Sequence, residues 1–210
     1  MRLFKGKKSW WLDDAQKIAE ENPYTFYKPS SEAVRLLRPK DGVKLIFRFD
    51  SDDPESPSAE RMWVEVKNIS GSKFEGVLDN DPAYITDLKC GDPLTFKEKH
   101  IIQVSIDDPV PSETDKYIAR CFVSHRVLYE GQKVGYCYRE EPDNDKDSGW
   151  RFLSGDESDE YVDDPDNISF VSLGALLRED DSPLELLESP IGSAFAIDPE
   201  SGAFVSVAGE

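Results

Sequence analysis

Cys121, His125 and Cys137 are the residues of this chain whose types best suit catalysis or metal binding. If residues 117–129 form one strand, Cys121 and His125 point to the same face, because side chains alternate along a strand. Cys137 lies on the next predicted strand, so three zinc ligands, or a thiol and a histidine base, would converge. However, the chain has no Cys-x-x-Cys pair and only two histidines, and buried thiols are mostly small apolar core residues. A small metal- or thiol-dependent enzyme around Cys121 and His125 is kept as the alternative, and we expect no catalytic residue, metal site or cofactor.

Asp143, Asp145 and Asp147 alternate along the chain in the way that the first three ligands of a calcium-binding loop do. Such a loop needs glycine at its sixth position and a bidentate glutamate at its twelfth. Those positions hold Ser148 and Ser154, so the pattern does not predict a calcium site.

Residues 149–167 form the most distinctive segment of the chain, with the sequence GWRFLSGDESDEYVDDPDN. Seven of its nineteen residues are acidic, yet it contains Trp150 and Phe152, which a flexible acidic tail would lack. We expect these aromatic side chains to anchor a rigid anionic surface loop in the core, whereas an exposed Trp150 would be an interface contact. The alternative is a solvated loop whose aspartates stabilise turns, as in residues 163–167. The predicted partner-binding residues are Asp156, Glu157, Asp159, Glu160, Asp163 and Asp164, supported by Trp150.

The net charge of the 210-residue chain is −18, which disfavours nucleic acids and anionic membranes as partners because their phosphates would repel it. The charge is unevenly distributed: residues 1–112 carry 17 basic and 20 acidic side chains, whereas residues 113–210 carry 8 and 23. This acidity favours a basic protein as the partner, because opposite charges accelerate encounter. Solubility alone is the other explanation for the charge.

The proline-containing segment 107–114, DDPVPSET, is the predicted linker between a domain at residues 1–112 and an acidic domain at residues 113–210. In the first domain, helices are predicted near residues 13–21 and 31–37. Short alternating segments spaced roughly ten residues apart favour a small curled sheet or an SH3-like barrel. These strands are expected at residues 24–27, 43–49, 61–67, 73–78, 94–97 and 101–106.

In the second domain, residues 117–129 and 133–139 are expected to form a hairpin around Glu130-Gly131-Gln132. A helix is predicted from Ser172 to Arg178. Further strands are expected at residues 150–153, 168–171, 193–197 and 203–207. The predicted fold class is therefore α+β, with two small domains that each contain a curved antiparallel sheet and one or two short helices.

The N-terminal residues lack the apolar stretch of a secretory signal, because Trp10-Trp11-Leu12 is followed at once by two aspartates. No run approaches the roughly 20 apolar residues of a membrane span. Three cysteines cannot all pair in disulfides, which favours reduced thiols in a cytoplasmic protein. Trp10 and Trp11 are expected to pack between the two halves of the chain rather than form an exposed contact patch.

Residues from about Ile118 to Val205 resemble a family of bacterial immunity-protein-like domains that was first defined as a domain of unknown function. The stretches that carry the resemblance are CFVSHRVL, VGYCYREE, DSGWRFLSGDE, DDPDNI and SPIGSAFAID. Residues from about Leu12 to Val104 resemble a second, uncharacterised family of small bacterial domains through IAEENPYTFYKPS, VKLIFRF, ERMWVEV, FEGVLDNDP and KCGDPLTF. The two resemblances imply a bacterial cytoplasmic protein that neutralises a toxin by direct binding, and neither supplies a catalytic residue.

The sequence thus favours a non-catalytic protein-binding module of the toxin-immunity type, whose acidic C-terminal surface covers a basic partner. That partner would be a basic protein, with a toxin implied by the resemblance, and neither nucleic acid nor a membrane is expected. A self-associating accessory or scaffold protein is the third alternative, which leaves homo-oligomers open.

Overall fold

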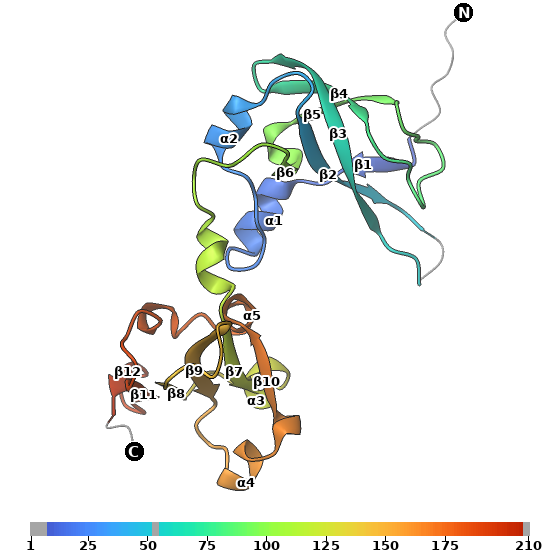
Figure 1. The fold of residues 1–210 in the computed structure, drawn as a ribbon. Coiled ribbons are helices and arrows are strands. Elements are labelled where there is room, and N and C mark those ends of the chain that lie inside the picture. Colours follow the sequence, from blue (N-terminus) through green and yellow to red (C-terminus); the bar gives the residue numbers. More distant parts are fainter. Residues whose placement is uncertain (1–7, 52–54, 208–210) are drawn as a thin grey trace, which may run out of the picture. The chain divides into compact units, whose positions relative to one another are not determined.

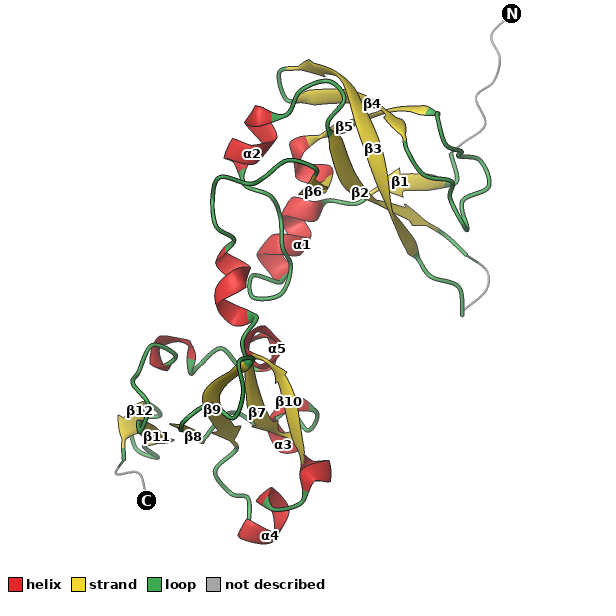
Figure 2. Ribbon diagram, in the orientation of Figure 1, coloured by secondary structure: helices red, strands yellow, loops and turns green. Residues whose placement is uncertain are grey.

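The computed structural model describes residues 8–51 and 55–207, and the chain divides into two compact units whose boundary lies between Ser112 and Glu113 (Figure 1). Each unit has its own six-stranded sheet, with short helices in the connections (Figure 2). The predicted α+β class with two small curved sheets is confirmed. In the described part of the chain, no helix is long and apolar enough to cross a membrane.

The N-terminal unit is a nearly closed antiparallel barrel with short helices in its connections. Its strands are β1 (Trp10–Leu12), β2 (Gly42–Phe49), β3 (Ala59–Ser70), β4 (Lys73–Leu78), β5 (Pro93–Lys97) and β6 (Ile101–Val104). Its helices are α1 (Ala15–Glu21), α2 (Ser31–Leu36) and the 3-10 helix η1 (Glu98–His100). β2 pairs with β1, β3 and β6, and the sheet continues from β3 through β4 to β5.

Alternating apolar side chains on the strands fill the interior of the barrel. Val43, Leu45 and Phe47 of β2 are all fully buried, as their alternation in the sequence predicted. Trp10 packs on the ring of Phe47, with centroids 5.3 Å apart, whereas Trp11 is 48% exposed. Trp10 thus belongs to the core of the N-terminal unit, which differs from the expected packing between the two halves of the chain. Trp11 is exposed because neighbouring residues of a strand face opposite sides.

The segment between α1 and α2 contains a turn rather than the strand predicted at residues 24–27. The carbonyl oxygen of Asn22 accepts hydrogen bonds from the backbone N–H groups of Thr25 and Phe26, which closes the turn. α2 then begins after Ser30, whose hydroxyl accepts a backbone hydrogen bond from the first turn of the helix. These local hydrogen bonds override the alternation of the aromatic residues.

The C-terminal unit is a mixed sheet with short helices between its strands (Figure 1). Its strands are β7 (Arg120–Ser124), β8 (Tyr136–Arg139), β9 (Asp147–Leu153), β10 (Ile168–Ser172), β11 (Ala194–Ile197) and β12 (Phe204–Ser206). Its helices are α3 (His125–Leu128), α4 (Asp159–Val162), α5 (Leu173–Glu179) and the 3-10 helices η2 (Glu113–Tyr117), η3 (Pro165–Asn167) and η4 (Leu184–Leu186). The strand order is β10-β7-β9-β8-β11-β12. β7 and β9 are parallel, which corrects the expectation of a purely antiparallel sheet.

The predicted hairpin of residues 117–129 and 133–139 is wrong, because β9 lies between β7 and β8 in the sheet. β7 ends at Ser124, whose hydroxyl accepts a hydrogen bond from the N–H of Arg126 at 3.2 Å and so starts α3. His125 is therefore the first residue of a helix rather than part of a strand. The apolar residues of segment 117–129 belong partly to strand β7 and partly to helix α3. Periodicity alone does not show where such a short strand ends and a helical turn begins.

The two faces of the C-terminal sheet have different environments. One face forms the hydrophobic core with Val127 of α3 and with Leu173 and Leu176 of α5. The sheet residues of this core are Cys121, Val123, Cys137, Trp150 and Phe152. The opposite face, which we call the open face, carries a row of cross-strand neighbours. This row consists of Phe170, Phe122, Arg151 and Tyr138, and the three aromatic residues in it are partly exposed.

Gly149, at the start of β9, is a position where only glycine fits. Its φ is +82°, and a Cβ atom would lie 2.2 Å from the carbonyl oxygen of Glu140. We predict that Gly149→Ala destabilises the C-terminal unit by roughly 2–4 kcal/mol, because it combines a left-handed conformation with a backbone clash. Urea unfolding, followed by the NMR signal of the Trp150 indole N–H, measures the loss in this unit alone.

The control for this prediction is Gly131→Ala. Gly131 has a φ of +74°, but no atom lies within 4 Å of the added Cβ, so only the conformational cost applies. We expect that cost to be about 1 kcal/mol. Equal shifts of the unfolding midpoint for the two variants would contradict the steric role of Gly149.

Candidate functional site

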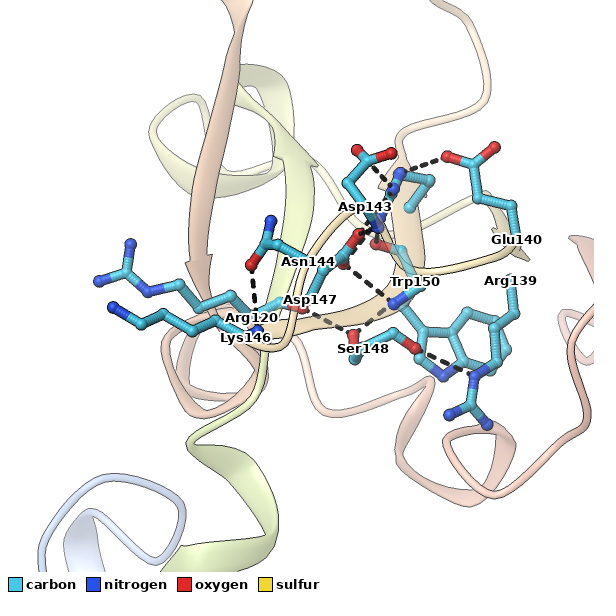
Figure 3. A network of polar contacts seen from close by, with 11 residues as sticks. Arg120, Arg139, Glu140, Asp143, Asn144, Lys146, Asp147, Ser148 and Trp150 are labelled. Atoms are coloured by element: carbon cyan, nitrogen blue, oxygen red, sulfur yellow. Dashed lines mark hydrogen bonds and ion pairs between the residues drawn. The ribbon is translucent and has the colours of Figure 1, made fainter.

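A buried arginine organises the strand that leads into the acidic segment. Arg151 lies in β9 with 7% of its surface exposed. Its guanidinium donates two parallel hydrogen bonds to the carboxylate of Asp147, at 3.0 and 2.9 Å. Its Nε donates to Glu140 at 2.6 Å, and Asp143 accepts a further hydrogen bond at 3.4 Å. Figure 3 shows the carboxylates of Glu140 and Asp143, from the connection between β8 and β9, gathered near Asp147, the first residue of β9.

Asp147 is fixed by the loop as well as by the arginine. Its carboxylate accepts hydrogen bonds from the backbone N–H groups of Asp143, at 3.0 Å, and Gly149, at 2.9 Å. Burial alone would raise the pKa of Asp147, but Arg151 and these two N–H groups outweigh burial and hold the pKa below its ordinary value. The guanidinium also lies 4.5 Å from the ring centroid of Phe122, so the open face of the sheet packs on the same cation.

These contacts give a different role to the aspartates of the calcium-like pattern. Asp143 and Asp147 bind the guanidinium of Arg151, and Asp145 is exposed in the loop between them. The two carboxylates therefore hold a cation that belongs to the chain itself. In residues 8–51 and 55–207, no group of three or more His, Cys, Asp or Glu side chains is arranged to hold a metal ion.

Trp150 and Phe152 anchor the acidic segment in the core, as the sequence predicted. Trp150 is 1% exposed and Phe152 is fully buried, and their rings stack with centroids 5.5 Å apart. The indole N–H of Trp150 donates to the carbonyl oxygen of Leu187 at 3.2 Å. Because its ring is enclosed, Trp150 can act only by supporting the segment, and its part in partner binding stays a prediction. It positions the segment that follows it.

Asp156 and Glu157, the first two acidic residues of the segment, accept hydrogen bonds from other groups of the domain. The carboxylate of Glu157 accepts hydrogen bonds from the N–H groups of Ser154 and Gly155, both at 2.8 Å. Asp156 accepts from the hydroxyl of Ser154 and from the guanidinium of Arg126, both at 2.5 Å. These two donors hold the pKa of Asp156 below its ordinary value. The carboxylates of Asp156 and Glu157 therefore stabilise the turn after β9.

The remaining acidic residues surround the short helix α4. Ser158 caps this helix, and Asp164 caps η3 by accepting a backbone N–H at 3.0 Å. Asp159, Glu160 and Asp163 are exposed, and no Lys or Arg of the described chain forms an ion pair with them. Of the six carboxylates singled out in the sequence, three thus accept hydrogen bonds from groups of the domain, and the other three are exposed without an ion pair in the described chain.

The alternative site around Cys121 and His125 is not assembled as the sequence suggested. Burial raises the pKa of the Cys137 thiol to about 12 and raises the pKa of Cys121 as well. A thiol that stays protonated at neutral pH is a poor nucleophile and a poor metal ligand. His125 begins α3, and its Nε2 lies 2.8 Å from the hydroxyl of Ser169. Cys121 and His125 therefore do not share a strand face.

Comparison with known proteins assigns each unit to a family. Residues 121–208 match the family described as an immunity protein Imm33 domain, and residues 11–107 match an uncharacterized protein family conserved in bacteria, DUF2314. The chain carries an Imm33 domain preceded by a DUF2314 domain. Both resemblances seen in the sequence are thereby confirmed. No curated protein and no solved structure matches the chain.

Asp147→Asn tests the buried ion pair of the Imm33 domain. The substitution leaves the guanidinium of Arg151 without its bidentate partner, and we predict a loss of about 3 kcal/mol in the unfolding free energy of the domain. Asp145→Asn is the matched control, because Asp145 is exposed in the same loop. Its replacement should change the stability by less than about 0.5 kcal/mol. Urea unfolding measures both variants, and equal stabilities would speak against the role assigned to Arg151.

Asp147→Asn also tests how the stability of the Imm33 domain depends on pH. The pKa of Asp147 is lower in the folded domain than its unfolded value of about 3.9. Its carboxylate therefore stabilises the domain fully above the unfolded pKa and stops doing so as the pH falls through the folded pKa. Because asparagine resembles the protonated side chain, the difference between wild type and Asp147→Asn should shrink below about pH 4. If the stability difference between wild type and Asp147→Asn stays constant from neutral to strongly acidic pH, the ionised carboxylate of Asp147 does not stabilise the domain.

Proposed function

We propose that the chain neutralises a protein toxin by binding to it directly through the Imm33 domain, without catalysing a reaction. The observation that carries this proposal is the match of residues 121–208 to an immunity protein domain. The buried thiols, whose pKa is raised, favour a binding role over thiol catalysis. The proposed partner is a protein with a basic surface, because residues 113–210 carry 8 basic and 23 acidic side chains.

The proposed contact surface is the acidic segment from Asp156 to Asp164. Within it, the exposed carboxylates of Asp159, Glu160 and Asp163 are available to a cationic partner. The other acidic residues of the segment stabilise the turns that present these three. A complex over this surface would cover a basic region of the toxin and would block the access of its substrate both sterically and by charge.

Capture of the partner, followed by a protection assay, tests the proposed function. The tagged full-length chain is incubated with a lysate of its source bacterium at low and high salt, because salt weakens contacts between exposed charges. The retained protein is then produced in a test bacterium with and without the chain. We expect a basic protein that stops growth alone and is harmless together with the chain. A retained protein that stays toxic in the presence of the chain would contradict the proposal.

Reversal of two exposed charges tests the electrostatic part of the proposal. We predict that Asp159→Lys/Glu160→Lys slows association with the captured toxin at least about tenfold at low salt, because electrostatic steering is lost. Since neither side chain has an ion pair within the described chain, the stability should change by less than about 0.5 kcal/mol. Surface plasmon resonance at two salt concentrations gives the rates, and thermal unfolding checks the stability.

Glu141→Lys/Asp145→Lys is the control for this reversal. It makes the same change in net charge on a different exposed loop of the Imm33 domain. We expect it to slow association less than about threefold, because screening limits the reach of exposed charges to roughly 10 Å. If both pairs slow association equally, the net charge governs binding rather than the acidic segment. If neither does, the electrostatic part of the proposal fails.

A further inference from the structure

A groove with an aromatic floor lies on the open face of the C-terminal sheet. Its volume is about 1070 Å³, and its floor is formed by Tyr136 and Tyr138 of β8, with Leu153 of β9 and Ala196 of β11 beside them. Tyr136 pairs in register with both Leu153 and Ala196. The two tyrosine rings lie 5.8 Å apart and remain partly exposed. The floor therefore presents aromatic surface that no helix of the domain covers fully.

One wall of this groove is acidic. The connection from β9 to β10 contains α4 (Figure 1), and Asp159, Val162 and Asp163 of this connection line the groove. The carboxylates of Asp159 and Asp163 form no ion pair with a Lys or Arg in the part of the chain that the structure describes. Glu157 also lines the groove, but its carboxylate is occupied by backbone N–H groups. Glu160 is not part of the lining.

Lys133 also lines the groove, and its ammonium group forms an ion pair within the domain. Its Nζ lies 3.3 Å from both Asp180 Oδ1 and the carbonyl oxygen of Glu179. Asp180 is 3% exposed and also accepts the N–H of Val134 at 2.8 Å. Because Lys133 neutralises this buried carboxylate, the wall carboxylates of the groove keep their negative charge uncompensated.

We propose that this groove receives an arginine side chain from an extended basic segment of the partner protein. The guanidinium would lie between Asp159 and Asp163, over the rings of Tyr136 and Tyr138. Arginine suits this site because its planar cation stacks on aromatic rings and donates to carboxylates at the same time. An anionic ligand would meet the repulsion of the wall. The inference rests on the proposed toxin binding and deepens it, since it names the group that is recognised and its place.

Titration of the full-length chain with two peptides tests the groove. One is a short arginine-rich peptide, and the other has citrulline in place of each arginine, which keeps the shape and removes the charge. With the arginine peptide, we expect NMR shifts at Tyr136, Tyr138, Leu153 and Asp159, and with the citrulline peptide we expect none. Equal binding of both peptides, shifts spread evenly over the acidic loops, or no binding of the arginine peptide would overturn the proposal.

Paired substitutions separate the groove from the general acidity of the segment. Asp159→Asn/Asp163→Asn removes both wall charges and should weaken binding of the arginine peptide about tenfold, because two carboxylate contacts are lost. Glu160→Gln/Asp166→Asn removes the same charge from exposed positions of the same segment that do not line the groove. We expect this control to change the affinity less than about twofold, because neither side chain lines the groove and exposed charges without direct contact contribute little. Equal weakening by the two pairs would overturn the proposal.

The captured toxin distinguishes a failure of this inference from a failure of the proposed function. If the toxin binds Asp159→Asn/Asp163→Asn as tightly as wild type, the groove is not its contact site, whereas toxin binding itself stands. If the captured protein is not neutralised by the wild-type chain, the proposed function fails. The peptide titration then still decides whether the groove accepts an arginine.

Discussion

The guanidinium of Arg151 is the group on which the rest of the Imm33 domain depends. A cation within a sheet is costly unless its donors are satisfied, and Asp147 satisfies two of them with support from the connection between β8 and β9. Glu140 and Asp143 of that connection bind the same guanidinium and so tie the connection to β9, which lies between β7 and β8. On one side of β9, Trp150 then enters the core. On the other side, Phe122 packs against the cation and continues the aromatic open face.

The acidity of the Imm33 domain has two physical roles. Part of it stabilises the fold, since Asp147 holds the buried cation and Asp156 pairs with Arg126 across a separation of 30 residues. The rest, above all Asp159 and Asp163, remains exposed beside a partly uncovered aromatic surface. Asp147 and Asp156 are neutralised by their arginine partners, so they contribute little to the attraction of a distant cation. Asp159 and Asp163 keep their charge and give the open face its expected preference for a cationic partner.

Features that depend on local pattern could be predicted from the sequence. The strand at residues 43–49 and the anchoring role of Trp150 follow from apolar alternation and from the expense of exposing large aromatic rings. The position of β9 between β7 and β8 could not be predicted, because the strand order depends on pairings between segments far apart in the sequence, and alternation within each segment does not specify them. The six carboxylates look alike in sequence, and their division depends on which cations and N–H groups the fold brings within reach. Arg126, placed by the unexpected helix α3, is one example.

Hydrogen exchange of the full-length chain, free and bound to the captured toxin, tests the central claim most directly. It locates the contact without any substitution that could disturb the fold. We predict slower exchange in residues 133–138 and 153–163 of the complex, with the N-terminal barrel and α5 unchanged. Slower exchange confined to the N-terminal unit or to α5 would contradict the claim that the toxin binds the groove and acidic segment of the Imm33 domain.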